Sequence, residues 1–183
     1  MGGVVAVLTC LKEQDLFNGL ILSSSALRAD QASSFLKWIA YLIGYFVPQM
    51  GIYNLEESTI NGISSQKDEV QKYLDDPLVY HGPLKAGWSS AYLKALATIE
   101  QHMTSITLPL LVVCGDKDSS DNINSAYFAH ENAGSRDKTL EIIPGGYHEM
   151  FNDIQKDVYL KIVSDWMSSR LEKVTSKVQN KQL

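Results

Sequence analysis

The sequence predicts an α/β protein with a parallel sheet, and three observations lead to that class. Short apolar runs typical of buried strands alternate three times with longer segments whose apolar residues recur at helical spacing. Strands that are connected through helices pair in parallel and place the helices on the faces of the sheet. The 183 residues are 45% apolar and 20% charged, which is typical of one globular domain with a substantial core.

The first part of the chain predicts a helix, a strand and an insertion. Residues 3–13 indicate a helix, and residues 19–22 (GLIL) form a short β-favouring run bounded by turn residues, which predicts a buried strand. From about residue 30 to residue 75, a crowded aromatic and aliphatic segment gives way to the polar stretch NLEESTINGISSQKDEVQKYL. We interpret this region as an insertion rather than as part of the sheet.

The rest of the chain continues the alternation. Residues 83–106 carry helical spacing, and residues 109–114 (PLLVVC) give the strongest strand prediction in the chain. A helix over residues 124–132 then leads to a strand at residues 139–143 (TLEII). The last predicted helix presents one apolar stripe that should dock on the sheet, formed by Tyr159, Ile162, Val163, Trp166 and Leu171.

Composition and charge exclude several classes of protein. The net charge is -5 and no dense block of Lys and Arg is present, so nucleic acid is not the expected partner. Cys10 and Cys114 lie inside apolar runs and are too few for a disulfide framework, and no cysteine spacing predicts a metal site. The N-terminal segment lacks the basic region and cleavage pattern of a secretory signal.

The longest apolar stretch also bears on location. Residues 35–47 (FLKWIAYLIGYFV) are interrupted by Lys37 and fall short of the roughly 20 residues that a membrane-spanning helix needs. This stretch is apolar on nearly every side, which suits a lid helix and a buried helix equally well. We therefore expect a cytoplasmic protein that meets membranes at most peripherally.

Side chains able to carry out chemistry follow two of the predicted strands. Sites in open parallel sheets lie beyond the carboxyl ends of the strands, and those loops hold Asp116 and Asp118 (GDKDSSDN) and His148 (PGGYHEM). A carboxylate there can accept a hydrogen bond from an imidazole and fix its tautomer. Aspartate followed by histidine is also the downstream half of the Ser-Asp-His chain order of α/β-hydrolases. A plainer interpretation remains open, because an aspartate after a strand is often a turn residue or a helix cap, as Asp121 or Asn122 could be here.

A nucleophile is harder to find. An elbow of the form G-x-S-x-G has one near match, GWSSA, with Ser89 at its centre, but no strand precedes it and Ala91 replaces the second glycine. Ser23, Ser24 and Ser25 follow a predicted strand but lack the glycines that allow a tight elbow. We therefore predict that the chain holds no catalytic serine.

Several motifs together indicate a family. They are MGG leading into a helix, followed by LILSSSAL, DPLVYHG, PLLVVCGDKDSSDNINSAY and DKTLEIIPGGYHEMFND. With these motifs, the chain resembles the C-terminal portion of monoacylglycerol lipases and related lysophospholipase-like or serine aminopeptidase-like α/β-hydrolases. In that family the elbow commonly reads Gly-His-Ser-Met-Gly-Gly. By this resemblance, Met1, Gly2 and Gly3 follow the nucleophilic serine directly.

The resemblance implies a partial α/β-hydrolase fold over residues 1–183, with the last three parallel strands, their flanking helices and a helical cap at residues 29–75, and without the first five strands. It assigns Asp118 as the catalytic acid, with Asp116 as the alternative, His148 as the base, and the backbone N–H of Met1 as one oxyanion donor. It implies no metal and no organic cofactor. The substrate class is a lipid ester, and the cap can meet a membrane surface.

Taken together, the sequence predicts a piece of a monoacylglycerol lipase-like serine hydrolase that acts on monoacylglycerols or lysophospholipids and is inactive by itself. One alternative is a non-catalytic module that binds lipid or protein, and another is a different α/β-hydrolase branch with other acyl or peptide substrates. Self-association through an exposed edge of the sheet is also expected, since unpaired strand edges recruit other strands.

Overall fold

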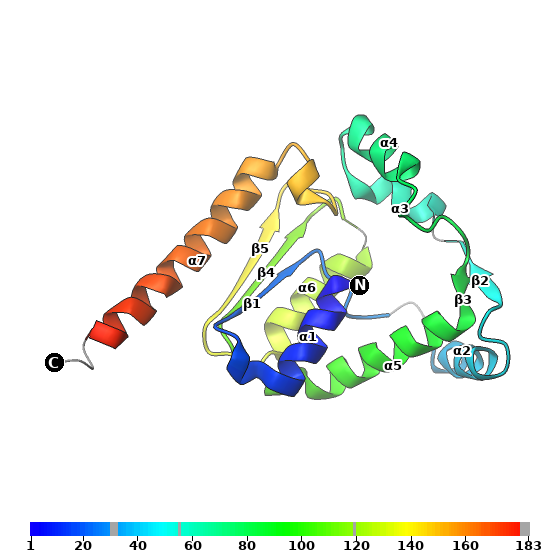
Figure 1. The fold of residues 1–183 in the computed structure, drawn as a ribbon, viewed down its shortest axis with the longest axis horizontal. Coiled ribbons are helices and arrows are strands. Elements are labelled where there is room, and N and C mark those ends of the chain that lie inside the picture. The colour runs from blue at the N-terminus through cyan, green and yellow to red at the C-terminus, as the bar shows by residue number, and fades with distance from the viewer. Residues whose placement is uncertain (30–32, 55, 119, 180–183) are drawn as a thin grey trace.

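The computed structural model describes residues 1–29, 33–54, 56–118 and 120–179 (Figure 1). Its central feature is a parallel sheet. Three strands of the described chain form it, β1 (Leu20–Ser23), β4 (Leu110–Gly115) and β5 (Lys138–Ile143), in the order β1-β4-β5. Leu20 pairs with Leu110, and Leu110 in turn pairs with Lys138. The three predicted strands and their parallel arrangement are therefore confirmed.

Helices cover both faces of this sheet (Figure 1). One face packs against α1 (Gly2–Glu13), α5 (Ala86–His102) and α6 (Ser120–Asn132), and the other packs against α7 (Lys156–Gln179). The predicted helix at residues 124–132 is the second part of α6, which begins four residues earlier. Short 3-10 helices follow at Gln14–Leu16, Met103–Ser105 and Met150–Asn152.

The central strand β4 supplies the core on both faces. All six of its residues are buried, because side chains alternate between the two faces of a strand and helices cover both. Leu110, Val112 and Cys114 join the cluster that contains α1, α5 and α6. Leu111 and Val113 join the cluster under α7. This continuous apolar run is the reason that the strand is readily predicted from sequence.

The stripe on the last helix is confirmed except at its end. Tyr159 is buried against the sheet, and Ile162, Val163 and Trp166 pack around it. Leu171, by contrast, is 64% exposed, so its predicted docking is wrong. The reason is geometric, since the C-terminal end of α7 extends past the strands (Figure 1).

A second group of elements lies to one side of the sheet (Figure 1). It contains α2 (Ser34–Phe46), β2 (Gly51–Tyr53), α3 (Glu56–Ile63) and α4 (Lys67–Asp75). Contrary to the expectation that this region holds no sheet, β2 pairs antiparallel with β3 (Leu84–Lys85). Strands of two or three residues are too short to show the alternation by which a strand is recognised in sequence.

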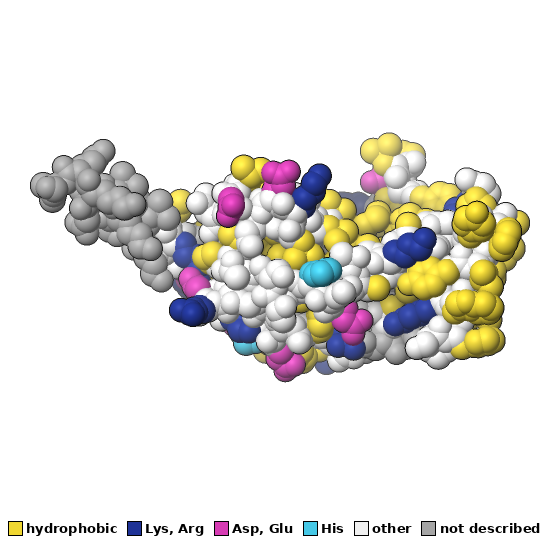
Figure 2. Space-filling model, turned by 90° about the horizontal axis from the view of Figure 1, so that it is seen from below, with side chains coloured by type: hydrophobic (Ala, Val, Ile, Leu, Met, Phe, Trp, Pro, Cys, Tyr) yellow, Lys and Arg dark blue, Asp and Glu magenta, His cyan; other side chains and the backbone are white. Residues whose placement is uncertain are grey.

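Helix α2 is a surface helix. Ser33 caps it by accepting a hydrogen bond from the N–H of Leu36 (3.3 Å), and the helix packs along α5. None of the residues in this fully described helix is buried, so the interpretation as a buried helix does not hold in this structure. Figure 2 shows the hydrophobic side chains gathered at the end of the molecule that holds α2. The most exposed large hydrophobic side chains of α2 are those of Phe35, Tyr45 and Phe46.

No helix in the described part of the chain combines the length and the apolar character required to cross a bilayer.

Candidate active site

Two glycines bring the loops after β4 and β5 into contact. A Cβ atom on Gly115 would overlap the backbone carbonyl of Gly146, and one on Gly146 would lie 3.1 Å from the Cα atom of Gly115. Across this contact, the N–H of Asp116 donates to the carbonyl of Ile143 (3.1 Å), and the N–H of Lys117 donates to the carbonyl of Gly146 (2.9 Å). The two loops are therefore held together by their backbones at the carboxyl edge of the sheet.

These loops place Asp118 against His148. Nδ1 of His148 lies 3.2 Å from Oδ2 and 3.3 Å from Oδ1 of Asp118. The Asp118 side chain is 2% exposed, whereas that of His148 is 44% exposed. A buried carboxylate behind a half-exposed imidazole is the arrangement in which the carboxylate orients the ring and the far nitrogen, Nε2, faces a substrate. Among the described residues, Nε2 has no hydrogen-bond partner.

The environment favours the protonated form of His148. The hydrogen bond with Asp118 raises the pKa of the imidazole, and burial opposes this. The negative charges of Asp118 and Glu149 raise the pKa further, while the amino group of Met1 lowers it, and the net shift is upward from 6.5.

Asn122 also contacts Asp118 and His148, and sequence analysis missed this role of Asn122. Its Nδ2 donates to Oδ1 of Asp118 (2.9 Å) and lies 3.0 Å from Nδ1 of His148. The residue is buried and lies inside α6, one turn after Asp118, so it does not cap that helix. The spacing of four residues was the available signal, because helical residues at i and i+4 share a face.

Cys114 lies next to the carboxylate of Asp118. Its Sγ atom is 3.8 Å from Oδ2 of Asp118. Burial, followed by the charge of Asp118, raises the pKa of the thiol to about 12. The thiol therefore stays protonated at neutral pH and is a poor nucleophile, because the thiolate is the reactive form.

The alternative acid, Asp116, takes a different role. It is exposed, and its Oδ1 accepts a hydrogen bond from the N–H of Gly145 (2.7 Å). Gly145 has a φ of +74°, in the left-handed region that favours glycine, so Asp116 braces the turn that follows β5. The structure thus brings Asp118, and not Asp116, against His148.

The serines considered from sequence differ in exposure, since Ser23 is exposed and Ser25 is half-buried, whereas the hydroxyls of Ser24 and Ser89 are buried. Ser89 lies within α5, and its hydroxyl is buried without a hydrogen-bond partner among the described residues. Ser24 follows β1 with a φ of +45°, but its hydroxyl is likewise buried, beside the thiol of Cys114. A nucleophile must be open to substrate, so neither hydroxyl is placed to attack an ester.

Met1 stands at the N-cap of α1, where its carbonyl accepts from the N–H of Val4 (3.0 Å). The first N–H groups of a helix lack partners within the helix and carry partial positive charge, which suits an oxyanion.

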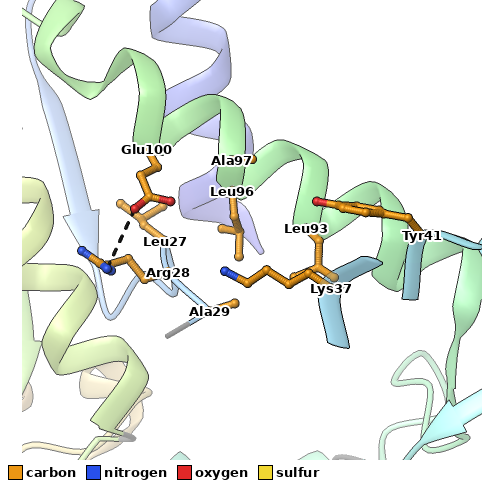
Figure 3. A pocket seen from close by; sticks show the side chains of 9 residues that line it. All are labelled: Leu27, Arg28, Ala29, Lys37, Tyr41, Leu93, Leu96, Ala97 and Glu100. Atoms are coloured by element: carbon orange, nitrogen blue, oxygen red, sulfur yellow. Dashed lines mark ion pairs between the residues drawn. The ribbon is translucent and has the colours of Figure 1, made fainter. Parts of the chain in front are cut away.

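A hollow of about 70 Å³ lies apart from these residues, between α2, α5 and the segment after β1 (Figure 3). Figure 3 shows the Lys37 side chain extending into it and Arg28 paired with Glu100 (3.9 Å). Neither Asp118 nor His148 lines it. Among the described residues, no cluster of His, Cys, Asp and Glu could hold a metal ion.

Comparison with known proteins adds a family to this geometry. Residues 1–155 match the family model described as "Serine aminopeptidase, S33". The chain is 31% identical to monoglyceride lipase of Mus musculus over 175 residues, covering 93% of this chain and 57% of the relative. It is also 31% identical to monoacylglycerol lipase of Mycolicibacterium smegmatis, covering 93% of this chain and 60% of that protein. The chain therefore spans less than two thirds of the length of these curated relatives.

Solved structures agree on the fold. The crystal structure of Paleococcus ferrophilus monoacylglycerol lipase superposes with a TM-score of 0.79 at 22% identity, covering 92% of this chain and 65% of that one. A soluble variant of monoglyceride lipase from Saccharomyces cerevisiae gives a TM-score of 0.72 at 15% identity, covering 92% of this chain and 59% of that one. At these identities the likeness shows the α/β-hydrolase fold alone.

Proposed function

Because the chain belongs to the serine aminopeptidase S33 family of α/β-hydrolases, we propose that it carries the acid and the base of a serine hydrolase that cleaves monoacylglycerol or lysophospholipid-type esters. The observation that carries the proposal is the contact between Asp118 and His148 at the carboxyl edge of the sheet. The names of the relatives support the choice of a lipid ester.

In this mechanism, Nε2 of His148 accepts the proton of a serine hydroxyl as the serine attacks the ester carbonyl. The same nitrogen then returns the proton to the glycerol oxygen that leaves, and a water molecule later hydrolyses the acyl-enzyme by the same exchange. Asp118 keeps the proton on Nδ1 and stabilises the imidazolium. No step of the proposal uses a metal or an organic cofactor.

The nucleophile belongs, in this proposal, at the N-terminal end of α1, with the backbone N–H of Met1 as one oxyanion donor. Two observations support the location. The amino group of Met1 influences the pKa of His148, and the start of a helix favours negative charge. The 183-residue chain is then inactive by itself, since among the described residues no serine hydroxyl is hydrogen-bonded to Nε2 of His148.

We propose that the elements within residues 29–75 form a lid over the site that meets lipid surfaces peripherally in the cytoplasm. The exposed aromatic side chains of α2 support this role. β1 stands at the edge of the sheet in the described chain, and this supports self-association of the isolated chain through that edge.

The experiment is to express the chain in frame behind an upstream half that ends in Gly-x-Ser and to measure ester hydrolysis. We expect activity that falls by about 10⁴ in Asp118→Asn and comparably in His148→Ala. Asp116→Asn is the matched control and should keep most of the activity. Full activity in Asp118→Asn beside an inactive Asp116→Asn would transfer the acid role to Asp116.

The isolated chain provides a second arm. We expect no labelling of its serines by a fluorophosphonate probe. Labelling that Ser89→Ala abolishes would contradict the proposed location of the nucleophile.

A second candidate is a non-catalytic lipid-binding module, which the exposed apolar surface of α2 favours. It predicts binding to vesicles with no hydrolysis even when the upstream half is present. Another hydrolase branch is a third candidate, because the chain is 22% identical to caffeoylshikimate esterase of Arabidopsis thaliana over 183 residues. Hydrolysis of a phenolic ester in preference to a monoacylglycerol would favour it.

A further inference from the structure

Asp153 is a buried carboxylate five residues after His148, directly after the 3-10 helix Met150–Asn152. Its Oδ1 accepts hydrogen bonds from the N–H of Ile154 (2.9 Å), from the N–H of Ser65 (3.2 Å) and from the hydroxyl of Ser65. Its Oδ2 accepts one from the N–H of Tyr147 (3.1 Å). Both oxygens are therefore occupied by donors.

These donors come from two segments that are far apart in sequence. Ser65 belongs to residues 62–66, which we call the lid junction; they comprise the last two residues of α3 and the segment that joins α3 to α4. Tyr147 immediately precedes His148 in the loop after β5. One carboxylate thus joins the lid junction to the loop that carries the histidine.

Backbone hydrogen bonds reinforce the same connection. The N–H of His148 donates to the carbonyl of Gly62 (3.0 Å), and the N–H of Glu149 donates to the carbonyl of Ile63 (2.8 Å). The N–H of Tyr147 donates to Asp153, so three consecutive backbone N–H groups, those of residues 147–149, donate hydrogen bonds either to the lid junction or to the carboxylate that is hydrogen-bonded to the lid junction.

A buried charge without hydrogen bonds is costly, and Asp153 has no ion-pair partner among the described residues. Burial raises the pKa of this carboxyl, but the hydrogen bonds it accepts, first that from Ser65, outweigh burial, and the pKa lies below its usual value. The carboxylate is therefore ionised at neutral pH and accepts from every donor around it.

We propose that Asp153 is a positioning residue, whose carboxylate fixes the loop of His148 to the lid junction and so holds the imidazole against Asp118. The position of the ring then depends on the lid. Displacement of α3 and α4 would pull Tyr147, His148 and Glu149 with the junction and weaken the contact with Asp118. The consequence for catalysis rests on the proposed function, but the positioning itself does not.

The test measures the position of the ring without requiring activity. In the 183-residue chain, NMR titration gives the pKa of His148, and hydrogen exchange gives the protection of the amides of Tyr147, His148 and Glu149. In Asp153→Asn, a side-chain NH₂ group replaces one carboxylate oxygen and cannot accept hydrogen bonds from the donors that faced it. We therefore expect hydrogen exchange at the backbone amides of Tyr147, His148 and Glu149 to accelerate about tenfold or more. We also expect the pKa of His148 to fall toward its ordinary value as the contact with Asp118 loosens.

Two further variants keep the test decisive. Ser65→Ala removes one donor from the lid side only and should give a smaller shift in the same direction, even if Asp153→Asn does not fold. Asp157→Asn changes an exposed carboxylate in the first turn of α7 and should alter neither quantity. The proposal is overturned if Asp153→Asn and Ser65→Ala leave both quantities as in the wild type, or if Asp157→Asn changes them equally.

The complete enzyme separates this inference from the proposed function. Suppose that the chain with its upstream half lacks esterase activity, but that Asp153→Asn still shifts the pKa of His148. This result would refute the proposed function and would still support the positioning role of Asp153. An active enzyme in which Asp153→Asn lowers kcat while KM stays constant would support both.

Discussion

Gly115 and Gly146 touch where β4 and β5 end, and a methyl group on Gly115 would overlap the carbonyl of Gly146. This contact sets the spacing of the loops that carry Asp118 and His148. Because the obstructing atoms belong to the backbone, a rotamer change cannot relieve the overlap.

We therefore predict that Gly115→Ala separates the two loops. The expected loss of stability is about 1–3 kcal/mol, as for other overpacked sites, and the pKa of His148 should fall because its contact with Asp118 weakens. Urea denaturation and NMR titration measure the two effects. Gly134→Ala is a suitable control, since a Cβ there would overlap the carbonyl of Thr104, which belongs to neither loop of the site, and it should lower stability without changing the pKa of His148. An equal fall of that pKa in the two variants would show that the contact between Gly115 and Gly146 does not position the pair.

The sequence predicted the parts of this site that depend on local pattern. The strand β4 is buried on both faces and so carries an unbroken apolar run, and the loops after β4 and β5 hold Asp118 and His148 at the edge where parallel strands end. The partners of Asp153 could not be predicted in the same way. Ser65 lies 88 residues away in the chain, and only the packing of the lid junction brings it to that carboxylate.

The same distinction explains the errors. β2 and β3 consist of three and two residues, so their pairing leaves no sequence period. Leu171 continues the helical stripe of α7, but a sequence period does not show where the sheet underneath ends. Asn122 was considered, beside Asp121, only as a possible helix cap because its type favours caps, whereas the structure uses its amide on Asp118.

The raised pKa of His148 predicts a pH dependence of stability. A histidine with a higher pKa in the folded state than in the unfolded state stabilises the fold below its unfolded pKa, and this contribution is lost as pH rises through the folded pKa. The free energy of unfolding of the wild type relative to His148→Gln should therefore be larger at pH 5.5 than at pH 8.5. Urea denaturation at both pH values measures this difference.

Asp118→Asn provides the matched control, since it removes the largest cause of the raised pKa. In that background, replacing His148 should give nearly the same change in stability at both pH values. A pH dependence that persists there would mean that another group shifts the imidazole.

Asn122 should act through Asp118. Replacing it with Leu removes the hydrogen bond to Oδ1 of Asp118 while filling a similar volume, and the carboxylate loses one of its donors. We expect a loss of about 1–2 kcal/mol in stability and a rise in the pKa of His148, because a less satisfied carboxylate binds the imidazolium more strongly.

The comparison variant is Asn124→Leu, an exposed position on the same helix. It should leave the pKa of His148 unchanged. A fall of that pKa in Asn122→Leu would mean instead that the amide mainly holds the ring in place rather than competing for the carboxylate.

The apolar surface of α2 predicts binding to lipid vesicles. Tyr45 is 80% exposed and Phe46 is 74% exposed, and neighbouring aromatic side chains on a surface helix can enter the boundary between headgroups and acyl chains. Burying each ring contributes roughly 1–2 kcal/mol, so replacing both with Ser should weaken partitioning into vesicles by about 30-fold to 1000-fold. Sedimentation with phosphatidylcholine vesicles measures this change. Leu171→Ser removes an apolar side chain of 64% exposure from α7 and is the matched control. If it weakens binding as much as the double variant does, contact with lipid is not specific to α2.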